Sequence, residues 1–167
     1  MGHVLLPMSI LSLLSTGAIF GFFYAWVCST MWGLDSADPR VAVAAMQAMN
    51  ASVQNAVFFP AFFLTPALVT TTAIVAARQG RKRSAAFFAS SATTYVMGAF
   101  IPTALVNVPM NEALAQVIVP TDNNAAQQLW QAFSEPWQFW NALRSIFSGV
   151  ALALTGLGIY CFTPKQT

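Results

Sequence analysis

Residues 4–31 read VLLPMSILSLLSTGAIFGFFYAWVCSTM and contain no charged side chain. A helix that crosses the hydrocarbon core of a bilayer needs about 20 predominantly apolar residues, so this stretch predicts a membrane span. A secretory signal peptide is disfavoured, because no Lys or Arg precedes the apolar core, the core is too long, and no clear small-x-small cleavage site follows it.

Three further stretches of this kind follow, at about residues 53–77, 85–106 and 146–162. Only 7% of the 167 residues are charged, whereas globular proteins average about a quarter. The spans lack the alternation of β-strands, which favours helices over a barrel. We therefore expect residues 1–167 to form a single all-α domain, an integral membrane four-helix bundle. The net charge of +2 is too small to indicate a nucleic-acid partner.

The charges are sorted along the chain. Four of the seven basic residues lie in Arg78-Gln79-Gly80-Arg81-Lys82-Arg83, between the second and third spans. The positive-inside rule places this connection in the cytoplasm, with both termini on the same side. Lys165 adds a basic residue there. The acidic residues all lie in or beside the two other connections: Asp35, Asp38, Glu112, Asp122 and Glu135. We expect a bacterial inner membrane location.

The two acidic connections carry helix signals. Asp38-Pro39 has the form of a helix start, and the helix is expected to run on into the second span with bends near Pro60 and Pro66. Residues 107–145 are expected to form short helices that cap the outer side of the bundle. Their signals are a start at Pro109, a break at Pro120, a start at Thr121 or Asp122, and another at Ser134-Glu135-Pro136.

Several kinds of chemistry are disfavoured by what the spans lack. His3 is the single histidine, and no Asp, Glu or His lies in the apolar core of a span, which argues against a metal site, a haem or a carboxylate proton relay. We therefore expect no cofactor, and we interpret His3 as an ordinary terminal residue. Cys28 and Cys161 lie near opposite membrane faces, too far apart for a disulfide.

Neutral amides and one arginine remain as candidates for a site. Arg40, Gln47, Asn50 and Gln54 fall within about 80° of one another on the helix that starts at Pro39. Trp137, Asn141, Arg144 and Ser148 share one face of the last helix. Asn107, Asn111 and Glu112 lie between these segments. Because unpaired polar groups near a membrane are costly, we expect the polar faces to point into the bundle.

Each of these residues also has a structural interpretation. Gln47, Asn50, Asn107 and Asn111 are as consistent with interhelical hydrogen bonding as with ligand contact. Trp137 and Trp140 fit either an interfacial aromatic belt or a site, and the belt is favoured for Trp130. Arg144 can extend outward to lipid headgroups, although its position between Asn141 and Ser148 favours an inward role.

Three motifs occur in order on this four-span chain: Met46-Gln47-Ala-Met49-Asn50, Asn107-Val-Pro109-Met-Asn111-Glu112-Ala-Leu114, and Trp140-Asn141-Ala-Leu-Arg144. Over nearly its whole length the chain resembles the anthrone oxygenase-like membrane family, also called DUF1772. The resemblance implies a membrane-embedded monooxygenase, an oxidoreductase that oxidises an electron-rich fused-ring phenolic to a quinone without an obvious metal or flavin. Its partners are then an apolar aromatic small molecule, dioxygen and membrane lipid.

The residues supply a hypothesis for such chemistry. Arg144 is expected to stabilise an enolate oxygen, helped by hydrogen bonds from Asn50, Asn107, Asn111 and Asn141. Glu112 is the candidate base. Gln47, Gln54, Trp26, Trp137 and Trp140 are expected to bind the substrate, the tryptophans by stacking. Two alternatives stay open: a non-catalytic binder or carrier of an apolar small molecule or lipid, and an accessory subunit of a membrane complex.

Overall fold

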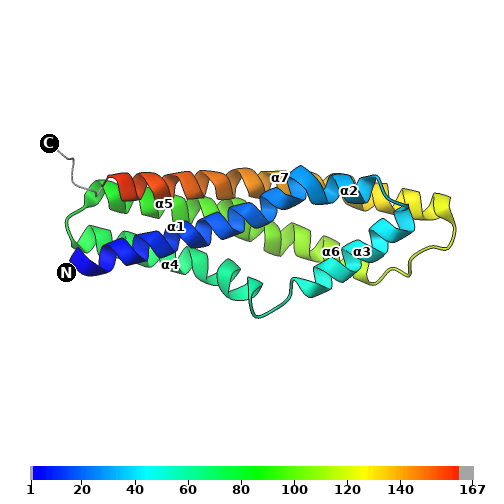
Figure 1. The fold of residues 1–167 in the computed structure, drawn as a ribbon, viewed down its shortest axis with the longest axis horizontal. Helices are drawn as coiled ribbons and strands as arrows, with labels where there is room; N and C mark the ends of the chain where they lie inside the picture. The colour runs from blue at the N-terminus through cyan, green and yellow to red at the C-terminus, as the bar shows by residue number, and fades with distance from the viewer. Residues whose placement is uncertain (1, 162–167) are drawn as a thin grey trace.

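Four long helical rods lie side by side in the computed structural model, which describes residues 2–161 (Figure 1). The side chain of His3 and the whole of Lys165 lie outside the described part, so the interpretations of these two residues are untested. Every element in the described part is a helix, and four helical segments are long and apolar enough to cross a membrane. The predicted all-α membrane bundle is therefore confirmed.

The elements follow the chain order. The first rod comprises α1 (Gly2–Ala25), the π-helical turn η1 (Trp26–Thr30) and α2 (Met31–Asp35). A separate helix α3 (Pro39–Ser52) precedes the second rod, α4 (Phe58–Arg78). The third rod comprises α5 (Lys82–Tyr95), the π-helical turns η2 (Val96–Phe100) and η3 (Thr103–Asn107), and α6 (Val108–Ala115). The fourth is the single helix α7 (Asn123–Tyr160).

The basic run of residues 78–83 and the acidic residues lie at opposite ends of the bundle, and Arg40 lies at the same end as the acidic residues. The turn between α4 and α5 lies at the end where α1 begins and α7 finishes (Figure 1). Gly80 makes this turn with a φ of 74°, a conformation that residues with a Cβ rarely adopt. We call this the basic end. The opposite end, which holds α2, α3, α6 and the first half of α7, is called the acidic end. The predicted sorting of charge is confirmed, whereas the membrane side of each end stays a prediction.

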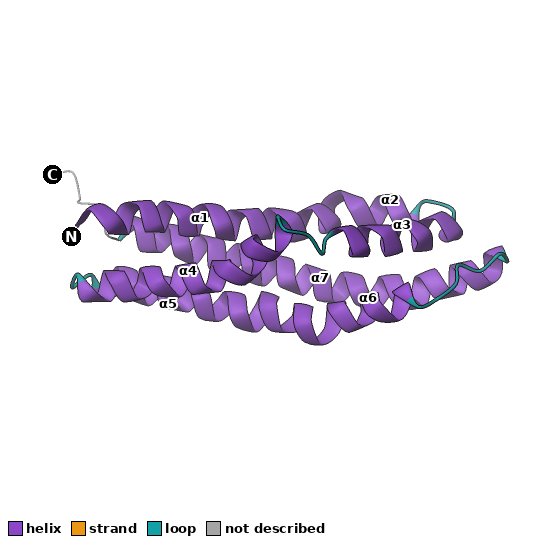
Figure 2. Cartoon of the chain, turned by 90° about the horizontal axis from the view of Figure 1, so that it is seen from below, coloured by secondary structure: helices purple, strands orange, loops and turns teal. Residues whose placement is uncertain are grey.

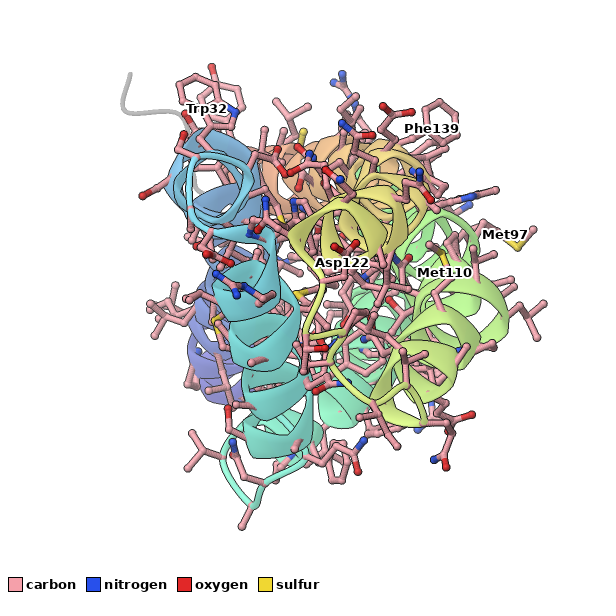
Figure 3. The ribbon with its side chains drawn as sticks, turned by 90° about the vertical axis from the view of Figure 1, so that its right-hand side faces the viewer. Trp32, Met97, Met110, Asp122 and Phe139 are labelled. Carbon is pink, nitrogen blue, oxygen red and sulfur yellow. The ribbon has the colours of Figure 1, made fainter. Side chains whose placement is uncertain are left out.

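Exposed apolar side chains define how much of the bundle lies in lipid. Large exposed apolar residues recur from Val4 to Tyr24 on α1, from Phe59 to Ile74 on α4, and from Phe139 to Tyr160 on α7. At 1.5 Å per residue, the residue of each series farthest from the basic end lies about 30 Å from the helix end there, which is the thickness of a hydrocarbon core. Phe139 points away from the bundle (Figure 3). We call this region the apolar belt; about 24 Å of α7 extends beyond it at the acidic end.

The predicted continuous helix into the second span is wrong. α3 ends at Ser52, and residues 53–57 form turns before α4 begins at Phe58. Asn55 makes the break: its Oδ1 accepts hydrogen bonds from the backbone N–H groups of Val57 and Phe58, at 2.8 and 2.9 Å, while its Nδ2 donates to the Ser52 carbonyl at 2.7 Å. One asparagine thus satisfies backbone groups at the end of one helix and the start of the next.

The helix signals predicted in residues 107–145 are confirmed except for the last one. α6 is a short helix that begins at Val108 with Pro109 in its first turn, and residues 116–122, which include Pro120, are not helical. The third rod continues to Ala115, and α7 begins at Asn123, capped by Asp122 as expected. Ser134-Glu135-Pro136 starts no helix, because the Ser134 hydroxyl donates to Asp35 at 2.8 Å instead of capping. The outer side is therefore covered by α2, α3 and the extended ends of the long rods, with α3 the separate short helix.

Small residues let the rods approach one another inside the apolar belt. Ser12 and Thr72 join α1 to α4 at 2.9 Å, and Ser91 donates to the Ala151 carbonyl of α7 at 2.8 Å. Gly98 lies directly against Phe147, since a Cβ at Gly98 would stand 2.0 Å from the Phe147 Cγ. Apolar lipid gives little hydrophobic drive for helix association, so such close packing and hydrogen bonding hold the bundle together.

Candidate functional site

A cavity of about 520 Å³ lies between the rods where the apolar belt meets the acidic end. Its walls come from the end of α1 and η1, from α3, from the start of α4, from η3 and α6, and from the middle of α7. A volume of this size suits a flat molecule of a few fused rings. Arg144 lies about 24 Å from Tyr160 along α7, within the belt, whereas Trp137 lies beyond Phe139. The cavity therefore crosses the level where the lipid tails end.

Aromatic rings form most of the apolar wall. They are Phe22, Phe23, Trp26, Phe58, Phe59, Phe62, Phe63 and Trp137. The Trp26 and Trp137 ring centroids lie 5.1 Å apart, and Phe58 and Phe62 are stacked at 5.5 Å. Stacked and tilted rings present flat faces, which suits an aromatic ligand.

Arg144 supplies the charge of the cavity. Its side chain is only 4% exposed, and its guanidinium donates to Thr103 Oγ1 at 3.1 Å and to Asn141 Oδ1 at 3.0 Å. The guanidinium also lies 4.5 Å from the Phe23 ring centroid and 5.5 Å from that of Trp137. Among the described residues no carboxylate forms an ion pair with it. A buried cation without an anionic partner is costly, so this position favours an anionic or strongly polar ligand.

Three buried polar groups that face the cavity have no hydrogen-bond partner. Asn107 is 1% exposed, and neither its Oδ1 nor its Nδ2 is paired. The Nδ2 of Asn50 and the Nε of Arg144 are also unpaired. All three side chains line the cavity, from α3, η3 and α7. Buried polar atoms are nearly always satisfied in proteins, so this cluster indicates a place where a ligand or water completes the hydrogen bonds.

Other predicted residues already have partners within the protein. Asn141 Nδ2 donates to the Phe23 carbonyl at 3.1 Å, which holds the amide oxygen toward Arg144. Trp137 Nε1 donates to Asn111 Oδ1 at 2.9 Å. Gln47 Nε2 donates to the carbonyls of Leu114 and Val117, both at 2.8 Å. These bonds tie α3 to α6 and α6 to α7, so they position the cavity walls.

The mouth of the cavity contains Glu112 and Gln54, both exposed and both lining it. Glu112 is the single carboxylate among the described residues that line the cavity. Gln54 lies in the turn after α3 rather than on a continuous helical stripe.

Three aromatic and charged residues lie away from the cavity. Trp140 does not line it and packs edge-on against Phe139 instead. Trp130 is buried and donates to Asp35 at 2.9 Å, so the belt interpretation of Trp130 is wrong. Arg40 does not join the polar stripe: it forms an exposed ion pair with Asp38, and the hydrogen bonds from Arg40 lower the pKa of Asp38 to about 2.

The lining also contains residues that sequence reasoning missed. Thr103 belongs to η3 together with the predicted Asn107, and the i→i+5 backbone pattern aims both residues at the cavity. Pro102 and Pro109 flank this turn and lack the N–H that an α-helix needs, a signal that marks a departure from α-helical geometry. Phe23 and Phe62 are buried in the same wall, and nothing in a Phe-rich sequence distinguishes them from ordinary packing residues.

The described residues contain no group of three or more His, Cys, Asp or Glu side chains placed to hold a metal ion. Both cysteines are free, as their predicted separation requires.

Comparison with known proteins gives one match. Searches of curated proteins and of solved structures find none. The anthrone oxygenase family matches residues 52–154, more than half of the chain. This range includes Asn107, Asn111, Asn141 and Arg144. It does not include η1, and of α3 it includes only Ser52. With its four apolar rods, this chain therefore belongs to the anthrone oxygenase family.

Proposed function

We propose that the protein is a membrane oxygenase that binds an electron-rich fused-ring phenolic of the anthrone type in this cavity and oxidises it with dioxygen. The observation that carries the proposal is the buried Arg144 guanidinium, without a carboxylate partner, beside the unpaired amide of Asn107 in an aromatic cavity. A cation and hydrogen-bond donors fixed in a dry site stabilise a developing oxyanion, because they need no reorganisation during the reaction.

The ligand fits the cavity in one orientation. Its fused rings lie between the aromatic faces of Trp26, Trp137 and Phe62, and its oxygen points to Arg144 and Asn107. Asn107 presents both a donor and an acceptor, so it can bond to a phenolic oxygen and to a neighbouring hydroxyl. Asn50 adds a donor from α3, and Asn141 holds the guanidinium in place.

The reaction balances without a further oxidant. Loss of a proton from the methylene carbon opposite the carbonyl gives an enolate, whose oxygen Arg144 stabilises. The enolate gives one electron to dioxygen, and the two radicals combine into a C–O bond to form a peroxide anion, which takes up a proton to become a hydroperoxide. Loss of water from this carbon breaks the O–O bond and leaves the quinone carbonyl. Overall one methylene and one dioxygen give one carbonyl and one water.

Glu112 is the proposed base, since it is the carboxylate that lines the cavity. It lies at the mouth, where its carboxyl group is exposed and can pass the proton to water. A substrate that arrives ionised needs no base. We therefore expect Glu112→Gln to leave the oxidation rate unchanged at high pH, where the substrate is ionised, and to lower the oxidation rate at neutral pH.

The proposal is tested with purified protein in detergent or nanodiscs, by following quinone absorbance and dioxygen uptake with anthrone as substrate. Arg144→Gln and Asn107→Leu are expected to lower kcat/KM at least 100-fold, which corresponds to the loss of about 2.7 kcal/mol of transition-state stabilisation. Arg40→Gln is the matched control, because this arginine is exposed and paired with Asp38. Folded Arg144→Gln protein that oxidises anthrone at the wild-type rate would refute the proposal.

A non-catalytic binder or carrier is the second candidate. It is favoured by one observation: the lining carboxylate lies at the mouth rather than beside the buried Arg144. A carrier would be stabilised against heat by a tricyclic phenol or quinone without consuming dioxygen. The same samples therefore distinguish the two functions.

We also propose that the basic end faces the cytoplasm, so that the cavity opens toward the outer leaflet. The basis is the run of four basic residues within residues 78–83 opposite the five acids. Labelling of single-cysteine variants in intact cells with a membrane-impermeant maleimide tests it. Ile118→Cys is expected to react, and Gln79→Cys is not.

A further inference from the structure

The residues that line the cavity are not equally buried. Seven of them are exposed, and they come from two edges that face each other: Ala51, Gln54, Phe59 and Phe63 on one side, and Val108, Glu112 and Ala115 on the other. The first edge belongs to the end of α3 and the start of α4, and the second belongs to α6. We call the space between them the lateral window.

The window has defined upper and lower limits. Toward the acidic end, Gln47 closes it by donating to the carbonyls of Leu114 and Val117 of the third rod. Toward the basic end, Phe62 stacks on Phe100 with centroids 5.2 Å apart, and Phe63 contacts the same ring at 5.6 Å. α4 packs extensively on α1 and α5, and far less on η3 and α6.

The helix break explains why this side stays open. Because residues 53–57 form turns, α3 and α4 do not form one continuous rod (Figure 2), and Val53 and Gln54 of the break line the cavity. On the side of α1, the rings of Phe22 and Phe58 lie in contact at 4.7 Å.

The polarity of the window changes along its length. Phe63 and Phe59 lie about 22 and 28 Å from Arg78 along α4, within the apolar belt. Gln54 and Glu112 lie beyond the belt at the acidic end. A molecule that enters here therefore meets aromatic side chains at the depth of the lipid tails and polar side chains at the depth of the headgroups.

We propose that the lateral window is the entrance through which a flat, apolar ligand with one polar edge passes directly from the lipid into the cavity. The ligand's rings pass between Phe63 and α6, while its polar edge stays near Gln54 and Glu112. This inference rests on the proposed binding function and adds the route. A sparingly soluble aromatic accumulates in the bilayer, so an entrance open to lipid avoids its transfer through water.

Ligand exchange rates test the route. The probe is 1,8-dihydroxyanthraquinone, a stable tricyclic that quenches tryptophan fluorescence, measured by stopped flow with protein in nanodiscs; Trp26 and Trp137 line the cavity and report binding. Phe63→Ala widens the lipid side of the window, and we expect both association and dissociation to accelerate at least threefold. Leu64→Ala is the matched control, since the neighbouring Leu64 is exposed and does not line the cavity.

A second variant separates the lipid route from an aqueous one. Ala115→Phe narrows the window at the acidic end, beyond the belt, and is expected to change either rate less than twofold. Slower exchange in Ala115→Phe together with unchanged rates in Phe63→Ala would overturn the lateral route in favour of entry from water. Equal effects of Phe63→Ala and Leu64→Ala would overturn it as well. A wild-type protein that binds no probe contradicts the proposed function itself, and the entrance with it.

Discussion

Asn107 and Asn141 give the sharpest test of the site, because they are the same residue type at the same burial with opposite hydrogen bonding. Both are 1% exposed and both line the cavity. Asn141 is bonded through both polar atoms, whereas Asn107 is bonded through neither. The perturbation is replacement of each by leucine, which has a similar volume and no polar atom.

The expected effects on stability have opposite signs. Asn107→Leu removes two unsatisfied buried groups, each costing about 1–3 kcal/mol, so the free energy of unfolding rises by at least about 1 kcal/mol. Asn141→Leu leaves the Phe23 carbonyl and one Arg144 N–H without a partner, so the free energy of unfolding falls by about 2–5 kcal/mol. Ligand affinity is lost in both variants, by at least tenfold in Asn107→Leu.

Reversible unfolding in mixed micelles, followed by circular dichroism, measures the two changes. Probe binding to the folded variants is measured in parallel. If Asn107→Leu is destabilised as much as Asn141→Leu, then Asn107 is an interhelical hydrogen-bonding residue and the argument for an unfilled ligand position fails. A stabilised Asn107→Leu protein that still binds the probe at wild-type affinity refutes the assignment of Asn107 to the site.

Three further predictions concern the frame around the cavity. Gly98→Ala places a Cβ against Phe147 and is expected to lower the free energy of unfolding by at least about 1–3 kcal/mol, while Gly21→Ala, with open space around it, leaves it unchanged in the same assay. Asp35→Ala leaves three donors of α7 without their acceptor and is expected to cost about 1–3 kcal/mol, seen as faster amide exchange in α2. The pKa of Asp38 is lowered from 3.8 to about 2, so its capping of α3 is complete above about pH 4 and is lost as the pH falls through 2. Amide exchange in the first turn of α3 is therefore expected to accelerate over that pH range in the wild-type protein. In Asp38→Ala, which lacks the cap, no such acceleration is expected.

The sequence predicted local features well where one physical rule dominates. Long apolar runs have a single stable solution in lipid, so the four spans and the turn at residues 78–83 were predicted. Asp38 was identified as a helix cap, and Asp122 as one of two possible caps beside Thr121, because capping depends on adjacent residues alone.

The failed predictions share a cause. Ser134-Glu135-Pro136 has the local pattern of a helix start, but Ser134 is bonded to Asp35 on another rod and Pro136 lies on an exposed face of α7, so the helix continues. Asn55 gave no recognised signal, yet its side chain ends α3 and starts α4. In both places the outcome depended on which partner a polar side chain reached.

The candidate site divides in the same way. The sequence by itself determined that Arg144 and the amides share polar helical faces near one end of an apolar bundle, because helical periodicity and the cost of polar groups near lipid are local rules. It did not determine that Asn141 and Asn111 are bonded within the protein while Asn107 is not, or that Trp140 points away from the cavity. Only the tertiary structure decided this, because satisfaction of a buried hydrogen bond depends on atoms brought together from different helices.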